Sequence, residues 1–144
     1  MTNNLNVLYL FTFPMSLVNY IEELKQDCIV DDINLKDSAL MLPAKKAKWV
    51  ARLILTKNEL NKLEKEKKKQ ISIVVEKLKE EAVATVSNAV LKSLAEKHES
   101  VIEIDNKIEE SLNLIDFLER VEKVMSSMSF DIGNIVKIVQ LETT

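Results

Sequence analysis

The chain contains few of the residues that form tight turns. Its 144 residues include one Gly and two Pro, and no Asn-Gly or Asp-Gly pair marks a hairpin. Glycine supplies positive φ and proline supplies turn corners, so folds with many short connections need both. Hydrophobic residues make up 47 % of the sequence, a proportion typical of a folded chain. These features predict an all-α fold with a few long helices.

The residues that usually carry chemistry are also scarce. Cys28 is the one cysteine and His98 the one histidine, so neither an intrachain disulfide nor a zinc site can be completed. A structural thiol and a solvated histidine at a helix end are the favoured interpretations. No glycine-rich loop for binding phosphates is present. Glutamates that occur in pairs are adjacent in sequence, so on a helix their side chains point in different directions and cannot converge on a substrate. We expect no catalytic residue, cofactor or metal, and a reducing, intracellular compartment.

Residues 1–14 form an apolar N-terminal extension that includes Leu5–Phe13. No basic residue precedes this run, and it is too short to span a bilayer. The segment is therefore interpreted as a packing or oligomer-contact element or as an over-extended start, and export is the weaker alternative. No membrane association is expected.

Positive charge is concentrated in one stretch. Residues 45–69 contain ten basic and three acidic side chains, a local charge of +7 in a chain of net charge −3. An acidic protein that gathers its cations in this way often presents them to a polyanion. The alternative is a solvated helix face, although such faces usually mix charges of both signs. The candidate phosphate contacts are Lys45, Lys48, Arg52, Lys57, Lys62, Lys65, Lys67, Lys68 and Lys69.

The first half of the chain reads as two helical segments. In residues 15–42, Ser16 is a possible helix cap and residues 31–34 form a polar connector. Pro43 predicts a kink or a helix boundary near residue 42, followed by a long basic helix over residues 43–81. Its apolar seam begins at Trp49, for which burial between helices is favoured over stacking on a base. The seam meets Lys67 and Gln70 before it resumes at Val74. Either the helix continues there with a solvated turn, or its packing partner ends.

Residues 82–144 read as C-terminal helices of the same single helical domain, residues 1–144. Residues 82–95 are apolar and compatible with a helix, and Ser100 with Glu103 matches a capping box. Ser126–Ser129 predicts a break before a short final helix. An apolar stripe through this region is expected to form an oligomer interface, made by Leu114, Leu118, Val121, Met125, Met128, Ile132, Ile135 and Val139.

The order of these segments resembles the UvsY family, the recombination mediators of T-even-like bacteriophages. Three stretches carry the resemblance: residues 20–31 (YIEELKQDCIVD), Leu42-Pro43 followed by Lys48-Trp49, and residues 115–136 (IDFLERVEKVMSSMSFDIGNIV). They occur in order and at similar spacing in a chain of similar length. Many relatives follow the basic helix with aromatic residues, which this chain lacks.

The resemblance implies a non-enzymatic protein that binds single-stranded DNA and helps load a RecA-like recombinase onto DNA coated by single-strand-binding protein. It implies a hexameric or heptameric homo-oligomer in the cytoplasm of the infected host cell. The DNA contacts would centre on Lys62, Lys65, Lys67, Lys68 and Lys69, with the C-terminal helices holding the ring together. The main alternative is a coiled-coil scaffold or adaptor with a solvated lysine face. A peripheral membrane protein is a weaker alternative, because the bulky apolar residues already serve a helix seam.

Overall fold

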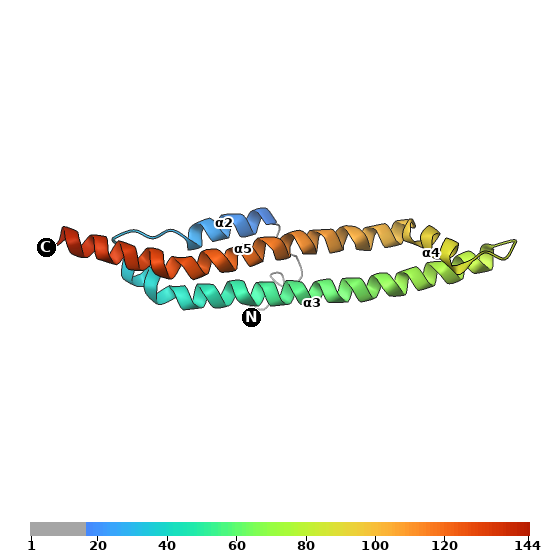
Figure 1. The fold of residues 1–144 in the computed structure, drawn as a ribbon, viewed down its shortest axis with the longest axis horizontal. Coiled ribbons are helices and arrows are strands. Elements are labelled where there is room, and N and C mark those ends of the chain that lie inside the picture. Colours follow the sequence, from blue (N-terminus) through green and yellow to red (C-terminus); the bar gives the residue numbers. More distant parts are fainter. Residues whose placement is uncertain (1–16) are drawn as a thin grey trace, which may run out of the picture. The chain divides into compact units, whose positions relative to one another are not determined.

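The computed structural model describes residues 17–144 and contains four helices in that range (Figure 1). They are α2 (Leu17–Asp27), α3 (Leu35–Glu81), α4 (Asn88–Glu96) and α5 (Glu99–Glu142). No strand occurs among these residues, and α3 and α5 span 47 and 44 residues. The predicted all-α fold with a few long helices is therefore confirmed. The apolar run Leu5–Phe13 and the expected cap Ser16 lie outside the described residues.

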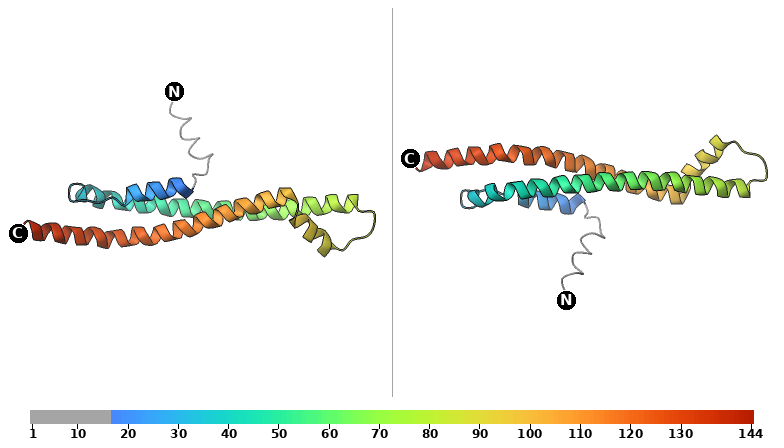
Figure 2. Two further views of the ribbon diagram at one scale, coloured as in Figure 1. Left: turned by 90° about the horizontal axis from the view of Figure 1, so that it is seen from above. Right: turned by 90° about the horizontal axis from the view of Figure 1, so that it is seen from below.

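The described residues form two compact units, and both long helices contribute to each. One unit contains residues 17–48 and Val121–Thr144, and the other contains Trp49–Arg120. The second unit holds the first part of α5, the whole of α4 and most of α3 (Figure 2).

In the Trp49–Arg120 unit, α3 and α5 pack as an antiparallel pair. Lys57 pairs with Glu119 and Lys67 with Asp105, so positions rise along one helix as they fall along the other. Trp49 is 1 % exposed, as the sequence predicted, and its ring meets the edge of Phe117 with centroids 6.3 Å apart. The side chains buried along this seam are Trp49, Leu53, Leu63, Val74, Val101, Ile104, Ile115 and Leu118.

The interruption of the apolar seam is filled by polar contacts between the two helices. The Lys67 ammonium lies 2.6 Å from an Asp105 carboxylate oxygen, and the Gln70 amide donates to the Ser100 hydroxyl at 3.0 Å. Further along α3, Val74 packs with Ala95 and Val101 in an apolar cluster. The helix therefore continues and its partner does not end, because α5 supplies polar groups at the matching positions.

The helix expected over residues 82–95 begins only at Asn88. Residues 82–87 lie outside any helix, and Val83 is fully exposed, so no packing compensates for ordering this β-branched segment. Ser87 caps α4 by accepting a hydrogen bond from the backbone N–H of Val90 at 3.4 Å.

The predicted capping box at Ser100 was also wrong, because α5 begins one residue earlier at Glu99. The exposed His98 takes the capping role instead. Its ring Nδ1 accepts from the backbone N–H of Ser100 at 3.2 Å. The sequence had predicted a solvated histidine at a helix end, which agrees with this position.

Two predicted breaks do not interrupt the long helices. Helix α3 runs from Leu35 through Pro43, so residue 42 is not a helix end. Pro43 and Ala39 are both exposed, and water can satisfy the Ala39 carbonyl that loses its N–H partner. Helix α5 likewise continues past Ser126 and Ser127, whose hydroxyls donate to backbone carbonyls of the preceding turn at 2.9 and 2.8 Å.

Two leucines of α5, one buried in the seam and one exposed, allow the same substitution to be compared at both kinds of position. Leu118 is 1 % exposed and Leu112 is 50 % exposed. Leu118→Ala should lower the free energy of unfolding by about 2–5 kcal/mol, because it removes buried methyl groups and leaves a cavity. Leu112→Ala should change it by less than about 0.5 kcal/mol. Urea denaturation followed by circular dichroism measures both, and equal losses would contradict the assigned seam.

Candidate nucleic-acid interface

Four lysines of α3 carry free positive charge on the outside of the Trp49–Arg120 unit. Lys62, Lys65 and Lys69 are spaced by three and four residues, which places them on one helix face, and Lys68 lies one turn beyond Lys65. The seam residues Leu63 and Val74 occupy the opposite side. All four lysines are exposed, and no ion pair or hydrogen bond within residues 17–144 engages their ammonium groups.

The surroundings of these lysines favour phosphate over base contacts. Residues 50–81 contain no aromatic side chain that a base could stack on. Exposed Leu55 and Ile73, at 58 % and 61 %, lie before and after the lysines along the helix. This surface, defined by Lys62, Lys65, Lys68 and Lys69, is called the free lysine face below.

Three other predicted contacts in the same unit are engaged within the chain. Lys57 lies 3.3 Å from Glu119, and Lys67 lies 2.6 Å from Asp105. The Arg52 guanidinium lies over the Trp49 ring, 4.7 Å from its centroid, and forms a cation–π contact. These side chains link or cover the α3–α5 seam, so their charges serve the fold.

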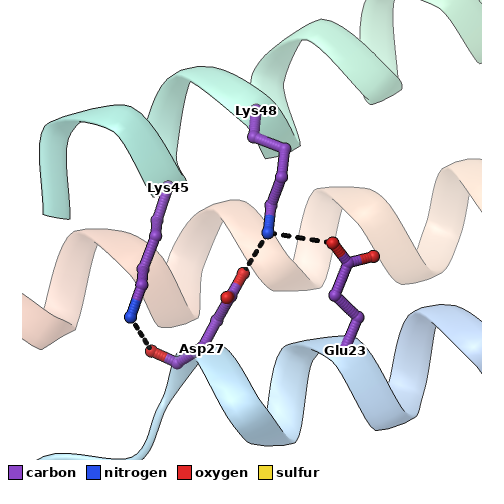
Figure 3. A network of polar contacts seen from close by, with 4 residues as sticks. All are labelled: Glu23, Asp27, Lys45 and Lys48. Carbon is purple, nitrogen blue, oxygen red and sulfur yellow. Dashed lines mark hydrogen bonds and ion pairs between the residues drawn. The ribbon is translucent and has the colours of Figure 1, made fainter. Parts of the chain in front are cut away.

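Lys45 and Lys48 are engaged in the other unit, where they hold α2 (Figure 3). The Lys48 ammonium bridges Glu23 at 3.0 Å and Asp27 at 2.6 Å. Lys45 donates to the backbone carbonyl of Asp27, the last residue of α2, at 3.0 Å. This carbonyl carries the partial negative charge of a helix C-terminus, which a lysine complements.

Sequence reasoning missed the residues that engage these cations. Glu23, Asp27, Asp105 and Glu119 come from α2 and α5, and their sequence positions alone give no register against α3. Lys46, which was not among the predicted contacts, donates to the Ser129 hydroxyl at 3.0 Å. The structure thus brings Lys62, Lys65, Lys68 and Lys69 together as a free group. Whether any of the nine predicted residues contacts DNA stays a prediction.

The predicted oligomer stripe lies largely inside the chain. Leu118, Val121, Met125, Met128 and Ile132 are between 1 % and 6 % exposed. The other three members, Leu114, Ile135 and Val139, are half-buried. The structure uses this stripe for packing within one chain, and its part in an interface between chains stays a prediction.

Other kinds of site find little support in the described residues. No cluster of three or more histidine, cysteine or acidic side chains within residues 17–144 could hold a metal ion. None of the helices described is long and apolar enough to cross a membrane. Burial raises the pKa of the Cys28 thiol, the Asp27 carboxylate raises it further, and Lys45 opposes both effects. A raised pKa leaves less thiolate at neutral pH, which fits a structural thiol.

Comparison with known proteins identifies the same architecture. No protein with a curated description matches the chain in sequence. Two crystal structures of the bacteriophage T4 recombination mediator protein UvsY match with TM-scores of 0.75 and 0.71, at 23 % and 20 % identity. The matches cover 89 % and 91 % of this chain and 99 % and 100 % of those chains, and at this identity they establish the shared fold. The family model described as "Recombination, repair and ssDNA binding protein UvsY" matches residues 23–144, so the chain belongs to the UvsY family.

Proposed function

We propose that this protein is a recombination mediator that binds single-stranded DNA through the free lysine face. The observation that carries the proposal is the group of four exposed lysines of α3 that no ion pair within residues 17–144 engages, in a stretch, residues 50–81, that lacks aromatic side chains. Each lysine that neutralises a phosphate releases counterions, so such a face gives binding that depends on salt and little on sequence. Family membership supports single-stranded DNA as the polyanion.

In this proposal the protein acts without bond chemistry of its own. It helps load a RecA-like recombinase onto DNA coated by single-strand-binding protein, in the cytoplasm of the infected host cell. Both partners and the loading step follow from the family resemblance. The free lysine face supplies the DNA contact that this role requires.

Replacing Lys65, Lys68 and Lys69 with alanine tests the assignment. Single-stranded DNA binding weakens with salt with a log–log slope of about −0.7 per neutralised phosphate, so the triple variant should flatten the slope by about 2. Helicity should be kept, because alanine is a good helix former. Fluorescence anisotropy of a labelled oligo(dT) across a salt series gives the slope.

A matched control removes three exposed lysines of α5, Lys107, Lys123 and Lys137, and so makes the same change in net charge. Its salt slope should stay close to that of the parent. A triple variant of α3 that binds as tightly as the parent, with the parent's slope, would refute the assignment. The scaffold alternative, which the engagement of five of the nine predicted contacts within the chain favours, would then replace it.

A comparison of Lys65 with Lys67 tests whether an unpaired lysine of α3 contributes more to DNA binding than an ion-paired one. Its ammonium is held 2.6 Å from Asp105, whereas Lys65 has no partner among the described residues. Lys65→Ala should therefore flatten the salt slope by about 0.7, and Lys67→Ala by less. Lys67→Ala should instead lower the thermal midpoint, because it leaves Asp105 unpaired beside the seam. Equal slopes for the two variants would contradict the distinction between free and engaged lysines.

We also propose that the protein is a homo-oligomer, a hexamer or heptamer, held together by exposed apolar residues of the C-terminal part of α5. Phe130, Ile138 and Leu141 are 77 %, 55 % and 76 % exposed. Their spacing of eight and three residues places them along one side of the helix. They lie in the C-terminal region that the sequence predicted for oligomer contacts, and a neighbouring chain can reach them.

Phe130→Asp combined with Ile138→Asp should shift the mass toward smaller species, because a charge at the centre of an apolar interface is strongly unfavourable. Circular dichroism should show unchanged helicity, since neither side chain is buried within the chain. Leu112→Asp, at an exposed position elsewhere on α5, is the matched control and should leave the mass unchanged. Sedimentation of the parent as a monomer at tens of micromolar would exclude the oligomer.

A further inference from the structure

Helix α2 contacts α3 through charged groups, and its apolar side chains Ile21 and Leu24 are only half-buried. None of its residues is fully buried. Its contacts to α3 include the two ion pairs of Lys48 with Glu23 and Asp27, and the hydrogen bond from Lys45 to the Asp27 carbonyl (Figure 3). Glu23 and Lys48 keep 28 % and 31 % of their side-chain surface exposed, so water and ions reach this network.

The oxygens of α2 that Lys45 and Lys48 contact resemble those of a phosphodiester, because all of them accept hydrogen bonds and two of them belong to carboxylates. The Lys48 ammonium lies between two anionic oxygens, Glu23 Oε1 and Asp27 Oδ2, at 3.0 and 2.6 Å. Lys45, three residues earlier on α3, lies on the same side of that helix and meets a third oxygen, the carbonyl of Asp27. An ammonium group exchanges a carboxylate for a phosphate oxygen with little change in the kind of bond made.

We propose that α2 is a displaceable acidic cover, and that Lys45 and Lys48 beneath it form a second site for the phosphates of single-stranded nucleic acid. The inference rests on the proposed function, since it adds contacts to the same ligand. Phosphate groups compete with Glu23 and Asp27 for the two ammonium groups. When they displace the carboxylates, α2 can leave α3, and none of the side chains of α2 itself is fully buried.

The connector between α2 and α3 supports this movement. Asp31 Oδ1 accepts from the backbone N–H groups of Ile33 and Asn34, and the Asp31 N–H donates to Asn34 Oδ1 at 2.8 Å. All of these hydrogen bonds lie within residues 31–34, so they do not depend on the contacts that α2 makes with Lys45 and Lys48. A change in the position of α2 can therefore leave the connector and the start of α3 intact.

Neutralising the two carboxylates tests the cover. The variant Glu23→Gln with Asp27→Asn keeps the side-chain shapes and weakens the competition with phosphate. The matched control is Glu22→Gln with Asp32→Asn, which makes the same change in net charge on exposed residues. Glu22 pairs with Lys25 of its own helix, so the control leaves the contacts of Lys45 and Lys48 untouched.

Oligo(dT) binding to the full-length protein is measured across a salt series. The test variant should bind more tightly than the control, with a slope steeper by about 1.4, because two more lysines become available to phosphates. A fourfold rise in salt should then cost it about sevenfold more affinity than the control. Adding Lys45→Ala and Lys48→Ala to the test variant should return the slope to that of the control. Equal salt slopes for the test and control variants would refute the proposal that α2 is a displaceable cover.

Cys28 provides a second readout in the unmodified protein. It follows Asp27 directly and is half-buried, and this burial together with Asp27 disfavours its thiolate. Saturating oligo(dT) should increase the rate of its alkylation by N-ethylmaleimide, because displaced α2 leaves the thiol more solvated. An unchanged or slower rate would overturn the displacement. If the parent fails to bind oligo(dT), the proposed function and the cover both fall, whereas salt-dependent binding with equal slopes for the two variants refutes the cover alone.

Discussion

The apolar stripe along α3 determines what each lysine of that helix does. Once Trp49, Leu53 and Leu63 face α5, the helical repeat of 3.6 residues fixes the direction of every other side chain. Lys62, Lys65 and Lys69 then point away from the partner helix. Lys67 falls on the seam itself and needs an anion there, which Asp105 provides at 2.6 Å. A buried or half-buried cation without such a partner would be costly, so the position of the stripe also accounts for the acidic residue on α5.

The polar contacts inside the seam define the register between α3 and α5, which apolar packing alone would leave poorly defined. Leucine and valine side chains pack in several offsets with similar energies, whereas Lys67 with Asp105 and Gln70 with Ser100 fit only one. A register shift by one turn would leave these groups beside the core without partners. The interruption of the apolar pattern therefore has a structural role: it fixes which residues of α5 lie opposite the lysine-rich part of α3.

The sequence was sufficient for the helical class, the long basic helix and the burial of Trp49, because these follow from hydrophobic period and from the scarcity of glycine and proline. It was misleading at Ser126–Ser129, where local preferences favour a break but α5 continues. Of the two alternatives at Pro43, the helix boundary was wrong because α3 continues, whereas the kink stays a prediction. At Pro43 the affected carbonyl lies on an exposed turn, and the serine hydroxyls bond to carbonyls of their own helix. The free lysines could not be separated from the engaged ones, because Glu23 and Asp105 come from distant segments whose register only the folded chain defines.

Net charge is a poor guide to the binding surface of this helix. The +7 of residues 45–69 meets four carboxylates from α2 and α5, those of Glu23, Asp27, Asp105 and Glu119, which leaves +3. What distinguishes the free lysine face is that no carboxylate within residues 17–144 forms an ion pair with its four ammonium groups, which are exposed along one helix. A phosphate chain gains most where counterions, and not protein carboxylates, are the groups displaced. The same reasoning makes Lys45 and Lys48 conditional contacts, because a phosphate must first displace Glu23 and Asp27, which the chain itself supplies.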